Sequence, residues 1–199
     1  MSNTLSEKLK ERTKINHQNL EKKLLEDLKR VRSLVEYAEL LVGFYCFFGG
    51  LEPYIAKHIR LDTLPDYPFR RKTAAMLDDL KSIGSRIPVL ADIDALPPIG
   101  NHFQALGALY VIEGSTLGGQ IICKMLRAQM ISDDPKGLSF FSGYQDQTYE
   151  MWSVFKETVD GITEPEHEEL VIDSANETFL RFTLWFDQHR ERVSEGGVT

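Results

Sequence analysis

One histidine differs from the other four in this sequence as a candidate metal ligand. His17 lies in the stretch ERTKINHQNLEKKLL, where Thr13, Leu20 and Leu24 follow a helical spacing of three and four residues. This spacing places the imidazole at the edge of an apolar stripe, with one side of the ring toward the core. Glu21 follows one turn later, where its carboxylate can orient a metal-bound imidazole. The pattern suits a metal ligand, although a surface His–Glu pair has the same spacing.

The remaining motifs narrow the kind of metal site that His17 could serve. The sequence has no HExxH motif, and no second His or Cys stands at ligand spacing from His17. It also has no GxSxG nucleophile motif and no phosphate-binding loop. A single axial histidine suits heme iron, because the porphyrin supplies the four equatorial nitrogens. Four histidines lie among polar residues near predicted helix ends and are expected to be solvated: His58, His102, His167 and His189.

A second chemical feature is the glycine-bearing stretch ALYVIEGSTLGGQIICKML, residues 108–126. It reads as a helix, yet Gly114, Gly118 and Gly119 lie in its middle, and each interior glycine costs about 0.5–1 kcal/mol relative to alanine. Gly114 and Gly118 share one face and leave it without Cβ atoms. A flat macrocycle could approach such a backbone, and so could a closely packed neighbouring helix. The glycines alone do not decide between these two explanations.

Length and composition set the context for both features. The 199 residues fit one domain over 1–199, and the net charge of −7 disfavours nucleic acid and anionic membrane surfaces as partners. Cys46 and Cys123 both lie in apolar runs, which predicts buried free thiols in a reducing compartment. The first residues lack the apolar core of a signal peptide, and no run reaches the roughly 20 apolar residues of a membrane span. We therefore expect a cytoplasmic protein.

The elements that must position these residues are all helical. Alternating strand patterns and hairpin turns are absent, whereas helical periodicity and capping boxes recur. We expect an all-α single domain of six to eight helices, with a frayed tail at 194–199. The predicted helices are 5–30, then 33–58 with an interruption at Gly49–Gly50 and a kink at Pro53, then 70–83, 101–130, 146–161 and 163–193. The predicted loops are 61–68, 87–100 and 132–143.

Together, the two stretches resemble the heme oxygenase family. LKERTKINHQNLE is similar to its proximal helix, whose T-x-x-x-H-x-x-L-E pattern is matched by Thr13, His17, Leu20 and Glu21. LYVIEGSTLGGQII is similar to its kinked distal helix, most closely in bacterial members that produce biliverdin. GLSFFSGY and ANETFLRFTLWF also fit, and they place Phe179 and Phe186 where the family lines its heme pocket with aromatic rings. The resemblance covers nearly the whole chain and implies a heme oxygenase-like helical bundle.

The resemblance implies an activity and a set of roles. Heme would be cleaved to biliverdin, ferrous iron and CO, using O2 and electrons from an external ferredoxin, flavodoxin or reductase. His17 would be the axial iron ligand and Glu21 would orient it. Gly114, Ser115, Gly118 and Gly119 would form the oxygen-binding side. A photoreceptor that uses biliverdin is a further possible partner.

The sequence departs from the family pattern at Ser115, where many members carry an aspartate that organises a water network. A hydroxyl can hold a water but cannot act as a charged anchor. Lys10, two turns before His17, and then Lys14 are the candidates to bind the heme propionates. The serine keeps open a heme-binding or heme-transfer protein without turnover. A thiaminase-like hydrolase on the same fold would need a nucleophilic cysteine, and neither Cys46 nor Cys123 has an adjacent base in the sequence.

Overall fold

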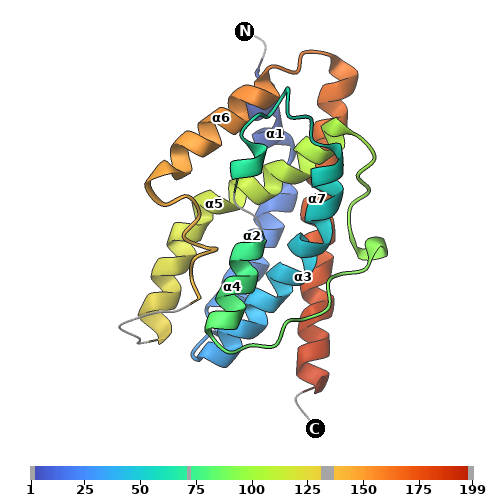
Figure 1. Cartoon of the computed structure of the whole chain (residues 1–199). Helices are drawn as coiled ribbons and strands as arrows, with labels where there is room; N and C mark the ends of the chain where they lie inside the picture. Colours follow the sequence, from blue (N-terminus) through green and yellow to red (C-terminus); the bar gives the residue numbers. More distant parts are fainter. Residues whose placement is uncertain (1–2, 71–72, 131–136, 197–199) are drawn as a thin grey trace.

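The computed structural model describes residues 3–70, 73–130 and 137–196, and within these ranges every regular element is helical (Figure 1). The all-α prediction is therefore confirmed. Seven α-helices follow one another along the chain: α1 Leu5–Arg12, α2 Lys14–Leu28, α3 Leu34–His58, α4 Ala74–Ser82, α5 His102–Met130, α6 Thr148–Asp160 and α7 Pro165–Gly196. Three short 3-10 turns lie at Tyr67–Phe69, Ile93–Ala95 and Gln145–Gln147.

The bundle is organised around two long helices, α5 and α7, which pack on each other. α3 packs against both of them, α1 and α2 lie along α7, and α6 covers part of α5 and α1 (Figure 1). α3 and α5 each contain an 18-residue window apolar enough for a membrane span, and 61% of either window is buried in the bundle. In this structure these two apolar helices form the centre of the core.

The predicted first helix is two helices, because the chain breaks at Thr13. Its hydroxyl donates to the Leu9 carbonyl at 2.7 Å, and its backbone lies at φ −96° and ψ −2°, outside regular helix geometry. α1 begins with the capping box of Thr4 and Glu7. The prediction of one helix over 5–30 was therefore wrong at this point, one turn before His17.

The second predicted helix begins at Ser33 as expected, and the hydroxyl of that residue accepts from the Glu36 backbone N–H. The interruption expected at Gly49–Gly50 is wrong, since α3 continues to His58. These glycines instead admit a close neighbour. A Cβ on Gly49 would lie 2.8 Å from Leu90, and a Cβ on Gly50 would lie 3.1 Å from the Ala91 carbonyl oxygen. A tertiary contact, not a kink, explains the glycine pair.

Several predicted boundaries shift by a few residues. α4 begins at Ala74 instead of 70, and the α6 region starts with the 3-10 turn before Thr148. The loop predicted over 132–143 lies partly outside the described residues. Its remainder, from Gly137, is fixed by Asp79, whose carboxylate accepts from the backbone N–H groups of Ser139 and Phe140 at 3.1 and 2.8 Å. α7 extends to Gly196, and only 197–199 of the predicted tail lie outside the described residues.

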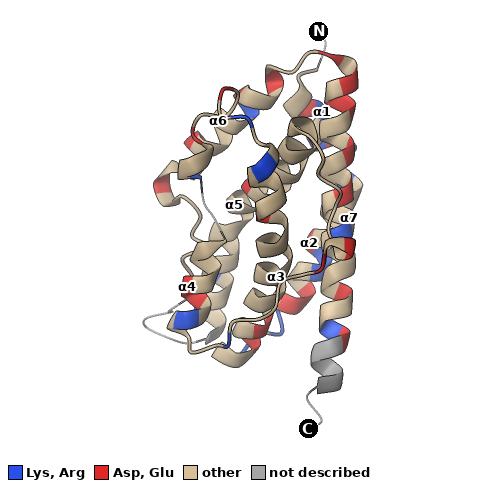
Figure 2. Ribbon diagram, turned by 45° about the vertical axis from the view of Figure 1, so that its right-hand side comes forward, with Lys and Arg blue, Asp and Glu red and all other residues tan. Residues whose placement is uncertain are grey.

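Charged residues connect the first two helices to the last one. Acidic residues follow one another along α7 (Figure 2). Lys8 bonds Glu168 at 2.6 Å, Arg12 bonds Glu169 through both of its terminal nitrogens, and Lys23 pairs with Asp187. Arg190 on α7 contacts Asp27 in return. A polar seam of ion pairs thus holds α1 and α2 against α7.

The buried thiols are confirmed, because both cysteines are free and buried. One of the four histidines expected at the surface is not there: His102 is only 9% exposed. Its Nδ1 accepts from the Arg60 backbone N–H at 3.2 Å, and burial lowers its pKa. His167 stacks on Phe103 with a centroid separation of 3.8 Å. The prediction of solvated histidines relied on their polar neighbours in the sequence, which give no information about these tertiary contacts.

Candidate heme-binding site

The His17 ring lies at the surface of α2 with one face against α7. Its side chain is 51% exposed, and its centroid lies 5.3 Å from that of Phe179. The Glu21 carboxylate comes within 3.9 Å of His17 Nε2, which is longer than a hydrogen bond. The structure therefore fixes one side of the ring by packing and leaves the other side accessible.

α5 changes direction in its middle (Figure 1). The hydroxyls of Ser115 and Thr116 donate to the carbonyls of Ile112 and Glu113, both at 2.6 Å, within the same helix. Such bonds to the preceding turn bend helices, and the neighbouring glycines remove side chains that would resist the bend. The expected kinked helix is present (Figure 1), and these two hydroxyl bonds lie within its glycine motif.

The three glycines of α5 have different surroundings. A Cβ on Gly119 would lie 2.2 Å from the Phe141 carbonyl oxygen, so close packing with the 138–143 segment accounts for this glycine. A Cβ on Gly114 would meet only Trp152, at 3.7 Å, and a Cβ on Gly118 would meet nothing within 4 Å. Packing within the chain therefore explains Gly119 but explains neither Gly114 nor Gly118. These two positions have room for a ligand.

Two helices border the candidate site: α2, which carries His17, forms one wall and α5, which carries the glycines, forms the other. The two walls meet at a contact that the sequence did not predict. Burial raises the pKa of the Tyr110 phenol, and the Thr13 side chain lies close enough to it to act in the opposite direction and lower that pKa. His17 lies one turn after Thr13 and Gly114 one turn after Tyr110. From this contact, α2 and the second half of α5 run in a similar direction (Figure 1). The i, i+4 spacing of Tyr110 and Gly114 was a usable signal in the sequence.

A buried charged network supports α5 from behind this wall. The Arg70 guanidinium, fully buried, bonds Glu113 at 2.8 Å and Asp66 at 2.8 and 3.1 Å. The Tyr144 hydroxyl donates to both Glu113 carboxylate oxygens, at 2.9 and 3.0 Å. Glu113 directly precedes Gly114, so this network fixes the start of the glycine motif. Arg70 and Glu113 are 43 residues apart, and no local pattern could have paired them.

The comparison with family sequence models decides what this arrangement belongs to. The model described as Heme oxygenase matches residues 3–188 of the chain. This protein belongs to the heme oxygenase family. Its family membership makes it a heme oxygenase enzyme by class, with heme as the expected substrate, and the match spans both the His17 helix and the glycine-bearing helix.

Individual relatives agree with the family match. The chain is 28% identical over 181 residues to heme oxygenase PigA of Pseudomonas aeruginosa, which covers 90% of each chain. It is 28% identical over 123 residues to a heme oxygenase of Xanthomonas campestris pv. campestris, which covers 56% of this chain and 72% of the relative.

Solved structures share the fold of this heme oxygenase family member. The NO- and CO-bound heme oxygenase from Neisseria meningitidis superposes with a TM-score of 0.80 at 22% identity, covering 94% of this chain and 92% of the other. Heme oxygenase from Leptospira interrogans gives a TM-score of 0.75 at 18% identity, covering 94% and 100%. The bundle is thus a heme oxygenase fold, as the sequence predicted.

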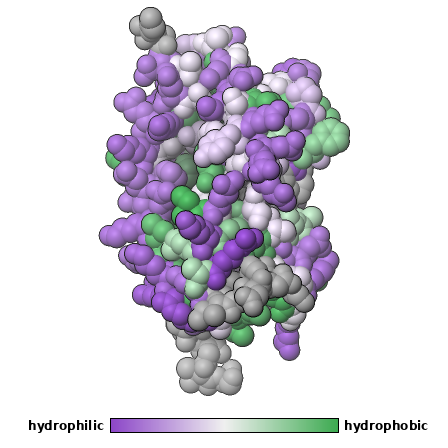
Figure 3. Space-filling model, turned by 90° about the vertical axis from the view of Figure 1, so that its left-hand side faces the viewer, coloured by the Kyte–Doolittle hydropathy of each residue, from purple (hydrophilic) through white to green (hydrophobic). Residues whose placement is uncertain are grey.

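The residues of this heme oxygenase chain fit a flat apolar ligand. On α5, Ile121 is 63% exposed and lies three residues after the open position Gly118, and on α2, Leu25 is 41% exposed two turns after His17. From the side of α5 and α6, apolar surface appears in the middle of a hydrophilic face (Figure 3). Exposed apolar side chains on the same two helices as the half-exposed imidazole and the two uncrowded glycines suit a porphyrin ring.

The two phenylalanines expected at the heme oxygenase pocket occupy different surroundings. Phe179 contacts His17, as described above, and is 5% exposed. Phe186 packs in the core, 5.1 Å from Phe44 and 4.9 Å from Phe182, with its ring under Gly43 of α3. The structure brings Phe179 to the candidate ligand, whereas it places Phe186 against α3.

The lysines predicted to bind propionates also differ from their neighbours on α1 and α2. Lys10 and Lys14 are exposed and, among the described residues, form no ion pair. Lys8 and Arg12, on the same helix as Lys10, are paired with α7. The structure therefore leaves Lys10 and Lys14 available for an anionic ligand, and their role toward heme remains a prediction.

Proposed function

We propose that this protein cleaves heme to biliverdin, ferrous iron and CO, using O2 and electrons from an external donor. The observation that carries this proposal is the pair of uncrowded glycines, Gly114 and Gly118, on a helix that meets the His17 helix at the Thr13–Tyr110 contact. Bound heme would supply both the iron that activates oxygen and the ring that is oxidised. The protein supplies position, shape and protons.

On the proximal side, His17 is the proposed axial ligand. Its imidazole must be neutral at the ligating nitrogen, and the Phe179 ring limits how far it can rotate. Glu21 and Thr13 are the proposed outer partners that hold the ring and the start of α2 in place. Lys10 and Lys14 are the proposed partners of the propionates, and Phe179 is the proposed aromatic lining, whereas Phe186 packs against α3 in the core.

On the distal side, the backbone at Gly114 and Gly118 restricts the space above the ring, and Gly119 fixes that backbone by packing on Phe141. Ser115 is the proposed residue that holds a water. Because its hydroxyl proton is directed at the Ile112 carbonyl, Oγ takes part in further hydrogen bonds as an acceptor. Ser115 would therefore orient a water through one of the water's protons.

The external donor is proposed to be a ferredoxin, flavodoxin or reductase that approaches the helices carrying His17. Residues 1–32 contain nine Lys and Arg but only five Asp and Glu, in a chain whose net charge is −7. Lys8, Arg12 and Lys23 are paired with α7 carboxylates, so the smaller excess of positive charge that remains is what would attract an acidic partner. A photoreceptor that takes up biliverdin and a cytoplasmic location complete the proposal.

One experiment tests the proposed activity. Hemin is added to the full chain and the Soret band is recorded, and then an electron donor is supplied in air with catalase present. Loss of the Soret band with growth of biliverdin absorption supports the proposal. A Soret band that stays unchanged would instead make the protein a heme carrier, the alternative that Ser115 keeps open. Failure to form any heme spectrum would reject both.

A further inference from the structure

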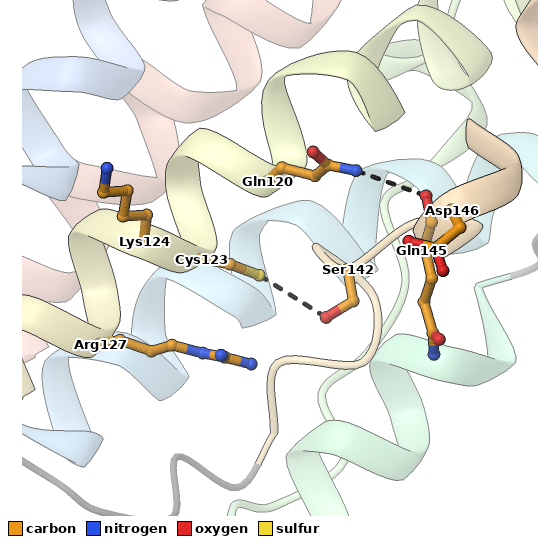
Figure 4. Close-up of a pocket in the computed structure, with 7 residues that line it drawn as sticks. All are labelled: Gln120, Cys123, Lys124, Arg127, Ser142, Gln145 and Asp146. Carbon is orange, nitrogen blue, oxygen red and sulfur yellow. Dashed lines mark hydrogen bonds between the residues drawn. The ribbon is translucent and has the colours of Figure 1, made fainter. Parts of the chain in front are cut away.

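A cavity of about 430 Å³ lies on the other side of α5, between its second half and the segment that leads into α6. Its lining comes from two regions of the chain: Gln120, Cys123, Lys124 and Arg127 on α5, and Ser142, Gln145 and Asp146 opposite (Figure 4). Cys123 follows Gly118 by five residues in the second half of α5, so the two positions face directions about 140° apart around the helix. The cavity is therefore separate from the proposed heme face.

The cavity has a positive group at its base. The Arg127 side chain extends toward Ser142, whereas the Lys124 amino group points away from the other lining residues (Figure 4). Neither cation forms an ion pair with a described residue. Arg127 is close enough to Cys123 to lower the pKa of its thiol, against the larger effect of burial, which raises it. A guanidinium that pairs with no carboxylate in the described part of the chain, facing a cavity, is suited to bind an oxyanion.

Neutral polar groups and a turn of unusual backbone geometry complete the cavity wall. The Cys123 thiol and the Ser142 hydroxyl lie 3.7 Å apart, and the Gln120 amide donates to the Gln145 carbonyl at 3.4 Å. Gln145 has a φ of 53°, the one positive φ outside glycine among the described residues, and Gly143 has a φ of 60°. A non-glycine residue in this region costs energy and is held there by its surroundings. The strained turn forms the wall opposite Arg127.

We propose that this cavity binds a small molecule with a single oxyanion group, either a phosphate or a carboxylate. Arg127 is the main contact, in a bidentate geometry, and the Gln120 amide supplies a neutral donor, whereas the Ser142 hydroxyl donates to the Leu138 carbonyl at 2.9 Å and only lines the cavity. The Asp146 carboxylate on the far wall repels a second anionic group, which limits the ligand to one. The volume admits a molecule much smaller than heme. This site is independent of heme turnover, because it lies on the opposite face of α5.

The test titrates the full chain with inorganic phosphate and, separately, with acetate, at constant ionic strength maintained with chloride. Binding is followed by amide NMR shifts and by the rate at which iodoacetamide alkylates Cys123, with Cys46 as the internal reference. Saturable shifts at Cys123, Arg127 and Ser142, with slower alkylation of Cys123 alone, are expected for at least one probe. The probe that saturates at lower concentration identifies which oxyanion the site prefers.

Two variants separate this site from general anion attraction. Arg127→Gln is expected to weaken binding about tenfold or more, because a charge-assisted bidentate contact is lost. Lys57→Gln removes an exposed cation at the end of α3 and is expected to leave binding unchanged. Shifts that do not saturate with either probe, or equal affinity in Arg127→Gln and the parent, would overturn the proposal.

Discussion

The two walls of the candidate site are built in opposite ways. The α2 wall presents a half-exposed histidine and is held to α7 by ion pairs whose side chains are partly exposed. The α5 wall presents a bare backbone and is held by a fully buried Arg–Glu pair and by a glycine packed on Phe141. The α2 wall supplies the candidate iron ligand, whereas the α5 wall limits the space available to the ligand that binds there.

This contrast indicates how rigidly each helix must be held. A ligand on a partly exposed helix can tilt with its helix, because surface ion pairs contribute little and adapt easily. A backbone that must approach a ring closely needs a rigid support, and buried, fully bonded networks give that rigidity. The molecule combines an adjustable ligand with a fixed steric wall.

The largest expected effect comes from removing the single chemical group of the α2 wall. His17→Ala is expected to lower heme turnover more than about 100-fold, above the 10–100-fold typical of losing an outer partner. The unfolding free energy should change by less than about 0.5 kcal/mol, because the side chain is half exposed. Biliverdin formation and chemical denaturation measure the two quantities. Added imidazole should restore part of the activity, and parent-like turnover in the variant would reject the axial assignment.

The next largest effect comes from removing the buried ion pair that supports α5. Arg70→Leu leaves the Glu113 carboxylate buried without its cation, and we expect a loss of about 3–5 kcal/mol in unfolding free energy. Arg60→Leu is the matched control, since Arg60 pairs with Asp62 in solvent and its loss should have little effect. Urea denaturation of both variants gives the comparison. Equal stability of the two variants would show that the buried pair does not support α5.

Two adjacent glycines of α5 distinguish packing within the protein from space left for a ligand. Gly119→Ala is expected to cost about 3 kcal/mol, because its Cβ would overlap the Phe141 carbonyl oxygen and the backbone there must move. Gly118→Ala meets nothing in the protein, so its stability should match the parent or exceed it, as alanine favours helix. Its heme affinity should fall if a ring occupies that space. Thermal unfolding and hemin titration measure these outcomes, and normal heme affinity in Gly118→Ala would place the ligand elsewhere.

The smallest effect concerns an ion pair that holds α1, the helix that leads into α2, against α7. A double-mutant cycle on Arg12 and Glu169 should give a coupling of about 0.2–1 kcal/mol that weakens with added salt. The Arg12 hydrogen bond lowers the pKa of Glu169, so this contribution is present at neutral pH. It is lost as the pH falls below about 4 and through that lowered pKa. Coupling that is unchanged by salt would contradict the picture of an adjustable wall.

The helices were predictable because periodicity and capping are local. Ser33 with Glu36 and the spacing around His17 fixed element type and approximate bounds. The features that failed depend on distant partners. Gly49 and Gly50 looked like a helix interruption, but the 90–91 segment that explains them is some forty residues away. The break at Thr13 also went unseen, since a buried threonine bonding its own helix leaves no distinctive pattern.

For the candidate site, the sequence could indicate which residues to consider but not what surrounds each of them. His17, Gly114 and Gly118 could be singled out from the sequence. The sequence alone could not, however, distinguish the role of Gly118 from that of Gly119. Only the position of Phe141 separates an open position from a packed one. The same limit applies to Phe179 and Phe186, which share a spacing but face α2 and α3. Arg70 and Glu113 meet through the fold alone.

The seam between the first two helices and α7 also determines when the site can form during synthesis. Its contacts join residues about 160 positions apart, such as Lys8 with Glu168 and Lys23 with Asp187. A nascent chain emerges from its N-terminus, so the helix carrying His17 leaves the ribosome long before its partner exists. Contacts of such sequence separation form late in folding. The candidate ligand is therefore made well before α7, the helix that holds it, and is among the last residues to be fixed in place.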